Sequence, residues 1–301
     1  MAHSHHHHHH HHHHIDPKSG DGRMALAVGV TILLTVAQII GGILSGSLAL
    51  IADALHNLSD ALSLFIAFFA RKIARRPADD IMTFGYGRAE VVAALINYTS
   101  LILVGLWLAF EAIMRFLDPQ PVDGWLVVGL ASLALVIDLV TAWLTFRMAK
   151  DSVNIRAAFL HNVADALGSV AVIVAGIAIL VFGWLWIDPA ITLLIAAYIL
   201  WMALGEMGSV IRILMLGTPE HLTPQDVTAT IMAVEGVDDL HHLKLWSAQE
   251  HETALTAHIV IAHSAWGNVA WIRQNIRTTL HDVHGIEMVT LELETAPEVC
   301  P

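Results

Sequence analysis

Cysteine and charged residues are both scarce in this chain of 301 residues. Its single cysteine, Cys300, excludes an internal disulfide and a zinc site built from cysteine thiolates. Charged side chains make up only 14% of the residues and hydrophobic ones 56%, whereas soluble domains carry about 25% charged residues. The mean hydropathy is +0.63. This composition indicates a membrane protein, whose partner is the lipid bilayer.

Basic residues are scarcer than acidic ones. The chain has 15 Lys and Arg against 27 Asp and Glu, which gives a formal net charge of −12. Because a nucleic-acid partner requires a basic face, the composition argues against one.

The first 23 residues, Met1–Arg23, are polar and include ten consecutive histidines, His5–His14. They show neither helical nor strand periodicity, so we expect a disordered tail. Two interpretations of the histidine run stay open: an expression tag, or a native His-rich tail that gathers metal. A signal peptide is not expected, because no small-residue cleavage site follows a short apolar core.

Residues 24–217 contain six apolar segments, each near or above the about 20 residues that a membrane-spanning helix needs. The sequence therefore predicts an α-helical transmembrane domain of six helices. The expected segments are Met24–Leu44, Leu48–Ala70, Val91–Phe116, Trp125–Arg147, Ile155–Phe182 and Pro189–Leu216.

The distribution of Lys and Arg predicts the orientation of these helices. With the N-terminus inside, the inner segments hold eleven basic residues and the outer loops only Arg115. Basic residues favour the cytoplasmic side, and an even number of helices returns the chain to the side on which it started. We therefore expect a multi-pass protein of the cytoplasmic (inner) membrane with both termini in the cytoplasm.

Residues 218–301 are expected to form a small soluble domain. Apolar periodicity predicts the order αββαβ, that of a ferredoxin-like open-faced sandwich. The expected elements are helix Pro224–Val234, strand His242–Ser247, strand Ala254–Ala262, helix Trp266–Val283 and strand Ile286–Glu294. This domain carries three basic and twelve acidic side chains, a net charge of −9, and eight histidines. Such a surface suits divalent cations, although a solvated acidic surface explains any single residue equally well.

Between residues 24 and 217, histidine occurs only at positions 56 and 161. Each stands in the sequence Leu-His-Asn-x-x-Asp-Ala-Leu, with Asp60 and Asp165 one helical turn further along the same face. Ionisable groups inside a membrane are costly and mark functional sites. Two such pairs on facing helices supply the four ligands of a tetrahedral zinc site. The alternative is that each pair only bonds to a neighbouring helix and stabilises the bundle.

Other intramembrane acids have no repeated motif. For Asp53 the sequence favours a hydrogen bond that packs two helices, with a fifth carboxylate near the metal as the alternative. Asp138 is expected to pair with a neighbouring helix or to relay protons. Glu90 is expected to pair with Arg88 near the inner interface.

Three local sequences carry a family resemblance: Gly46 to His56, Phe84 to Glu90, and Gly217 to Glu220. Together with the six spans, the two His-x-x-x-Asp motifs and the acidic tail domain, they make the chain similar to the cation diffusion facilitator family of the bacterial zinc-efflux type. The resemblance implies a homodimer that exports Zn²⁺ in exchange for protons and is not an enzyme. It places the transport ligands at His56, Asp60, His161 and Asp165.

The resemblance also implies two further kinds of metal site. Members bind metal in the tail domain near the dimer contact, which points to His241 and His258, with Glu292 and Glu294 at the last-strand positions. Zinc would then be a regulatory ligand as well as the substrate, and no other cofactor is implied.

Some members bind a second metal in the loop after the second helix, through an aspartate and two histidines. The matching positions here are Asp79, Met82 and Tyr86, so we expect no metal in that loop.

Mixed imidazole and carboxylate ligands favour Zn²⁺, with Co²⁺, Cd²⁺ and Fe²⁺ as secondary substrates. Metal binds neutral imidazole and displaces protons, and an unperturbed histidine titrates at about pH 6.5.

Two alternatives to metal export remain: a membrane metal sensor that signals through its tail domain, and a membrane metallohydrolase. Against the hydrolase, the spans have no His-Glu-x-x-His motif, and four filled ligand positions leave no place for an activated water.

Overall fold

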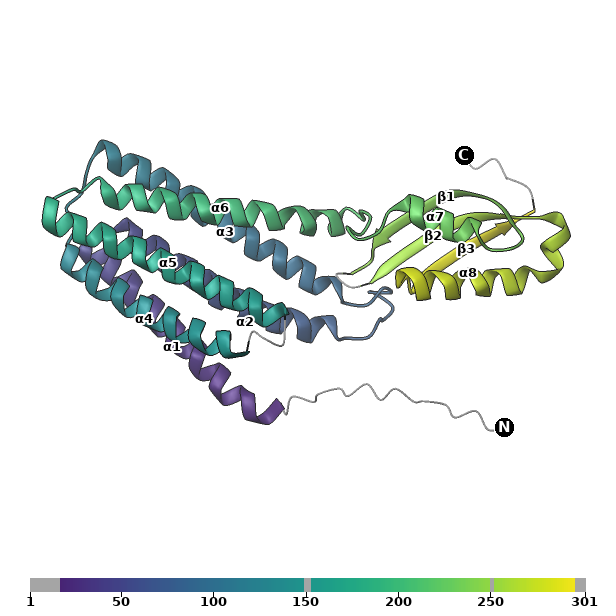
Figure 1. The fold of residues 1–301 in the computed structure, drawn as a ribbon, viewed down its shortest axis with the longest axis horizontal. Helices are drawn as coiled ribbons and strands as arrows, with labels where there is room; N and C mark the ends of the chain where they lie inside the picture. Colours follow the sequence, from purple (N-terminus) through teal and green to yellow (C-terminus); the bar gives the residue numbers. More distant parts are fainter. Residues whose placement is uncertain (1–16, 149–152, 250–251, 296–301) are drawn as a thin grey trace.

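The computed structural model describes residues 17–148, 153–249 and 252–295. Its shape is elongated: a bundle of six long helices lies at one end and a small α+β domain at the other, with α6 leading from the first to the second (Figure 1). The division into a helical membrane part and a tail domain is the one expected from the sequence. The N-terminal residues 1–16, which include His5–His14, lie outside the described residues.

The six expected helices are all present. They are α1 (Pro17–Ser45), α2 (Leu48–Ala74), α3 (Arg88–Leu117), α4 (Gly124–Met148), α5 (Val153–Phe182) and α6 (Ile187–Leu214). Within the described residues, α2 to α6 are long and apolar enough to cross a membrane, and the apolar part of α1, Ile32–Ser45, is shorter.

The described part of the first helix includes residues 17–23, which are helical where the sequence suggested a disordered tail. The polar composition of this segment conceals the helix, since it lacks the apolar periodicity on which the expectation was based.

The start of α2 is fixed by a carboxylate from α6. Asp188 is fully buried and accepts hydrogen bonds from the Ser47 hydroxyl at 2.5 Å and the Leu48 amide at 2.8 Å. The Ser47 hydroxyl in turn caps the helix by accepting from the Leu50 amide at 3.1 Å. Gly46, with φ of 72°, makes the left-handed turn that precedes this cap. These contacts anchor α2 about two turns before His56.

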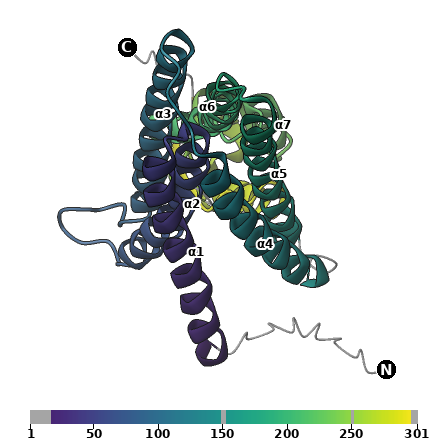
Figure 2. The same ribbon diagram turned by 90° about the vertical axis from the view of Figure 1, so that its left-hand side faces the viewer.

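Within the bundle, α4 packs along α5, and α3 packs along α6, while α2 contacts α1, α3, α5 and α6. Figure 2 looks along the bundle from the end away from the tail domain and shows α2 among the other helices. One core cluster joins α2, α3 and α6 through Leu48, Leu101, Leu108 and Ile199. Because α2 also contacts α5, the two His-x-x-x-Asp helices are neighbours.

The tail domain has the predicted order αββαβ. Its elements are α7 (Pro224–Met232), β1 (Val237–Ser247), β2 (Thr253–Ile261), the short 3₁₀ helix η1 (His263–Asn268), α8 (Val269–His284) and β3 (Met288–Glu294). The sheet order is β1-β2-β3, with β1 antiparallel and β3 parallel to β2. Apolar side chains of α7 and α8, such as Ile231 and Ile276, cover one face of the sheet.

Two tail-domain boundaries differ from the prediction by more than two residues. Strand β1 starts at Val237 rather than at His242, because register shifts after Val237 and after His241 interrupt the alternation of apolar and polar residues. Helix α8 starts at Val269, since Trp266 belongs to the preceding 3₁₀ turn.

Candidate metal centres

The first centre lies between α2 and α5. The Nε2 atom of His56 is 3.8 Å from Oδ2 of Asp60 and 3.3 Å from Oδ1 of Asp165. One ligand atom of each of these three residues lies within 4.8 Å of the other two. His56 is only 6% exposed and the Asp165 side chain 11%, whereas the Asp60 side chain is 31% exposed, so the group lies mostly inside the bundle.

These distances fit ligands of one zinc ion. Zinc binds imidazole nitrogen and carboxylate oxygen at about 2.0–2.2 Å, so two ligands of a tetrahedral ion are separated by about 3.3–3.6 Å. The observed separations of 3.3 and 3.8 Å lie at or near that range. They are longer than an ordinary N–H···O hydrogen bond of about 2.7–3.2 Å. The spacing therefore suits a shared cation better than direct hydrogen bonding between the ligands.

His161, the fourth expected ligand, lies on α5 one turn before Asp165, but its side chain lies outside the described residues. The structure thus brings together three of the four residues expected at this centre. The fourth stays a prediction from helical periodicity, because residues i and i+4 share a helix face.

The surroundings of the centre include two residues that the sequence did not single out. The ring of Tyr198, from α6, meets the His56 ring edge-on with 6.0 Å between centroids. Gln38, from α1, donates a hydrogen bond of 2.8 Å to the buried carboxylate of Asp53. Each is a single polar or aromatic residue in an apolar run, so no motif marks it.

The intramembrane acids mostly form the interhelical contacts that the sequence favours. The Gln38 bond joins Asp53 on α2 to α1, and the Ser169 hydroxyl of α5 donates to Asp138 of α4 at 3.0 Å. Helix α5 passes so close to Asp53 that a Cβ on Gly168 would lie 3.3 Å from its Oδ1. The expected pair of Glu90 with Arg88 is wrong: Glu90 faces Arg71 at 3.8 Å, and Arg88 donates to the Ala248 carbonyl of the tail domain at 2.8 Å.

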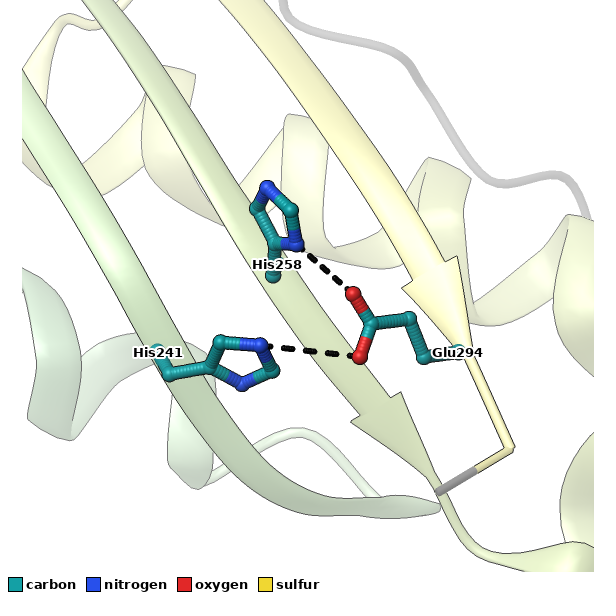
Figure 3. A group of neighbouring side chains, drawn as sticks. All are labelled: His241, His258 and Glu294. Carbon is teal, nitrogen blue, oxygen red and sulfur yellow. Dashed lines mark hydrogen bonds and ion pairs between the residues drawn. The ribbon is translucent and has the colours of Figure 1, made fainter. Parts of the chain in front are cut away.

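The second centre lies on the sheet face that α7 and α8 leave uncovered. His241 of β1, His258 of β2 and Glu294 of β3 point toward one another there (Figure 3). Nδ1 of His258 is 2.6 Å from Oε1 of Glu294, and Nε2 of His241 is 3.5 Å from Oε2 of the same carboxylate. His258 is paired with His241 on one side and with Glu292 on the other, and Glu294, two residues after Glu292, lies on the same face of β3.

Three of the four tail-domain residues expected from the sequence therefore converge, and each offers a ligand atom within 4.8 Å of the others. Glu292 lies at the rim: its Oε2 is 3.4 Å from Nε2 of His258, and 65% of its side chain is exposed. At 2.6 Å, the His258–Glu294 contact is a hydrogen bond that holds a proton between the two groups. A bound metal would replace that proton.

Two family models together match almost the whole chain after the histidine run. The cation efflux transmembrane domain matches residues 24–215, and the cytoplasmic domain of cation efflux proteins matches residues 219–296. The chain belongs to the cation diffusion facilitator family. It is a multi-pass membrane protein of this family of transporters.

Several curated proteins are similar over nearly their full length. A cadmium, cobalt and zinc/H⁺-K⁺ antiporter of Bacillus subtilis is 38% identical over 264 residues, which cover 86% of this chain and 84% of that protein. The zinc transporter ZitB of Pectobacterium atrosepticum is 38% identical over 301 residues, or 98% and 89% of the two chains. ZitB of Escherichia coli is 32% identical over 304 residues, or 99% and 94%.

In the loop after α2, Asp79 accepts hydrogen bonds from other residues of the same loop. The carboxylate accepts hydrogen bonds from the amides of Ile81 and Met82, at 2.9 and 2.7 Å, and from the Tyr86 hydroxyl at 2.7 Å. The Met82 amide contributes most to holding the pKa of Asp79 below its usual value, followed by the Tyr86 hydroxyl. The same bond raises the pKa of Tyr86, because its proton is shared with a carboxylate.

We expect this loop to bind no zinc at neutral pH. A lowered folded-state pKa means that Asp79 stabilises the loop above the ordinary aspartate pKa of about 3.9, and that this contribution is lost as the pH falls through the lowered value. Asp79→Asn should therefore loosen the loop, seen as faster proteolysis or hydrogen exchange of residues 77–88, without changing the number of zinc ions bound. A lower zinc stoichiometry in Asp79→Asn than in the parent would contradict the expectation.

Proposed function

We propose that this protein is a proton-coupled exporter of Zn²⁺ that works as a homodimer in the cytoplasmic membrane, with both termini in the cytoplasm. The observation that carries the proposal is the centre formed by His56, Asp60 and Asp165, whose spacing suits one zinc ion. His161 completes the four ligands by helical periodicity. The names of the similar antiporter and zinc transporters support the same activity.

The ligand set explains how metal and protons exchange. Zinc binds imidazole only in its neutral form and carboxylate only when ionised, so each metal ion that enters displaces protons. When the centre faces the cytoplasm, the ligands lose protons and bind zinc. When it faces the more acidic side, the ligands gain protons and release zinc. Histidine suits this cycle because its ordinary pKa of about 6.5 lies near the pH on both sides of the membrane.

The substrate class follows from the same ligands. One or two imidazoles with two carboxylates favour late transition metals over Mg²⁺ and Ca²⁺. Zn²⁺ is the first substrate that we propose, and Cd²⁺, Co²⁺ and Fe²⁺ are secondary ones. The relative from Bacillus subtilis, named for cadmium, cobalt and zinc, supports this range.

The tail domain is proposed to be a zinc-responsive dimerisation domain. His241, His258 and Glu294 would hold a regulatory ion, with Glu292 at its rim. The domain contacts the membrane part at several points, for instance through the bond from Arg88 to the Ala248 carbonyl. Zinc binding in the tail can thereby be communicated to the start of α3.

Two other functions use the same residues and are less well supported. A metal sensor would bind zinc without moving it. A metallohydrolase would need an open ligand position and a catalytic group beside the metal, and the protein is proposed not to be an enzyme.

Zinc uptake by proteoliposomes separates these functions from export: an imposed pH gradient should drive zinc accumulation, and collapsing the gradient with a protonophore should stop it. Zinc binding without accumulation would favour the sensor.

A further inference from the structure

His242 has an unusual backbone conformation next to the tail-domain centre. Its φ is 51°, and within the described residues only one other non-glycine residue, Leu216, has a positive φ. This left-handed conformation is unfavourable for a residue with a Cβ. His242 lies at the register shift between His241 and Lys244, where β1 bulges against β2. Strained residues persist where their surroundings or their function require them.

The bulge changes where the His242 side chain lies. Successive residues of a regular strand point to opposite faces, so without the bulge His242 would face away from His241. Instead, the centroid of its ring is 5.4 Å from that of His241 and 5.4 Å from that of His258. The rings of His241 and His258 are 5.2 Å apart. Three imidazoles thus lie at nearly equal distances from one another.

The ring centroids of this triangle have the spacing of three imidazoles around one zinc ion, while the ligand atoms within 4.8 Å of one another are those of His241, His258 and Glu294. A Zn–N bond of about 2.0–2.1 Å places each ring centroid about 3.2 Å from the metal and the centroids about 5.2 Å from one another in tetrahedral geometry. The measured values of 5.2, 5.4 and 5.4 Å are close to that spacing. Glu294, 6% exposed, supplies a carboxylate beside two of the rings.

We propose that His242 is the fourth ligand of the tail-domain centre, which then holds Zn²⁺ with three imidazoles and the Glu294 carboxylate of a single protomer. A buried nitrogen also points to a ligand at this place: Nε2 of His241 makes no hydrogen bond within the described residues, although Glu294 lies 3.5 Å away. A set of three nitrogens and one oxygen selects Zn²⁺ and Co²⁺ over Mg²⁺ and Ca²⁺. The strained bulge is what brings His242 to the metal.

The inference rests on the proposed tail-domain site, and the test keeps the two apart. The chain is shortened to residues 17–301, because the histidine run binds divalent metal itself, and it carries Asp60→Ala and Asp165→Ala to disable the membrane centre. Purified in detergent, this parent is titrated with Co²⁺. We expect one tight site with the intense visible absorption that tetrahedral Co²⁺ gives, which Zn²⁺ abolishes by competition.

His242→Ala in this background should bind Co²⁺ at least about tenfold more weakly, as expected for a change at a metal site, and with a weaker visible band. His242→Gly should show the same loss, but its metal-free melting temperature should not fall, because glycine accepts the left-handed backbone. His281→Ala is the matched control: among the described residues, the side chain of this exposed histidine bonds only to its neighbour Asp282, and its removal should leave Co²⁺ binding unchanged.

Each outcome bears on a different claim. If His242→Ala and His242→Gly keep the affinity and spectrum of the parent while His241→Ala loses them, His242 is not a ligand and the tail-domain site stands. If the parent itself binds no Co²⁺, both the site and the inference are wrong. If both His242 variants and His241→Ala lose the spectrum while His281→Ala keeps it, the four-ligand centre is supported.

Discussion

We expect Asp60→Ala, Asp165→Ala and His56→Ala each to abolish proton-driven zinc flux into proteoliposomes. Removing one ligand leaves a buried centre with too few donors to replace the hydration shell of zinc, and it removes a group that exchanges a proton for the metal. Loss of a partner that only orients a ligand typically costs 10–100-fold in affinity, so loss of the ligand itself should reduce flux by more than about 100-fold.

Controls must distinguish the loss of a zinc ligand from misfolding of the variant. Tyr198→Phe keeps the aromatic edge against His56 and removes only the hydroxyl, so it should keep most of the flux. Each variant should elute as a homodimer and should melt near the parent in the absence of zinc. Near-normal flux in any two of the ligand variants would contradict the proposed centre.

His161→Ala tests the part of the centre that rests on periodicity alone. If His161 is the fourth ligand, its removal should reduce flux as much as removal of His56 does. A His161→Ala variant with parental flux would reduce the centre to the three residues that the structure brings together.

We expect zinc to raise the melting temperature of the tail domain, residues 218–301, and to favour its dimerisation. The domain has its own apolar core, which includes Ile231, Ile259 and Ile276, so it is expected to fold without the membrane part. At a free zinc concentration a hundredfold above the dissociation constant, binding to the folded state stabilises it by about 2.7 kcal/mol. For a domain of this size, that corresponds to a rise of about 10–20 °C in melting temperature.

The net charge of the tail domain explains why zinc binding should favour its dimerisation. Two copies of a domain with a net charge of −9 repel each other, and a bound divalent cation on each reduces that repulsion. Melting and sedimentation with and without zinc measure both effects. His241→Ala combined with His258→Ala should remove them, whereas His281→Ala should not. If zinc changes neither the melting temperature nor the association constant of the unaltered domain, the regulatory role is wrong.

The large features of the fold could be predicted because they depend on strong, repeated signals. Six apolar segments of membrane-spanning length identify α1 to α6, and the αββαβ order follows from apolar periodicity in the tail domain. The His-x-x-x-Asp motifs were recognisable because histidine is otherwise absent from the spans. Two motifs on separate helices also require those helices to be neighbours, which the contact of α2 with α5 satisfies.

Features that depend on one residue or on a break in periodicity could not be predicted. Gln38 and Tyr198 reach their partners only through the packing of α1 and α6 on α2. His242 was not identified because a regular strand would have turned its side chain away, and a bulge leaves no clear pattern in a single sequence. The helical conformation of residues 17–23 was missed because the segment is polar.

The most direct measurement of the central claim, exchange of zinc for protons at the α2–α5 centre, is proton movement driven by zinc alone. Proteoliposomes are prepared with equal pH inside and outside, and zinc is added outside while a trapped dye reports the internal pH. The predicted result is that the interior becomes alkaline as zinc enters and protons leave, in unaltered protein but not in Asp60→Ala. Zinc entry with no change in internal pH, or an equal pH change in Asp60→Ala, would contradict the mechanism.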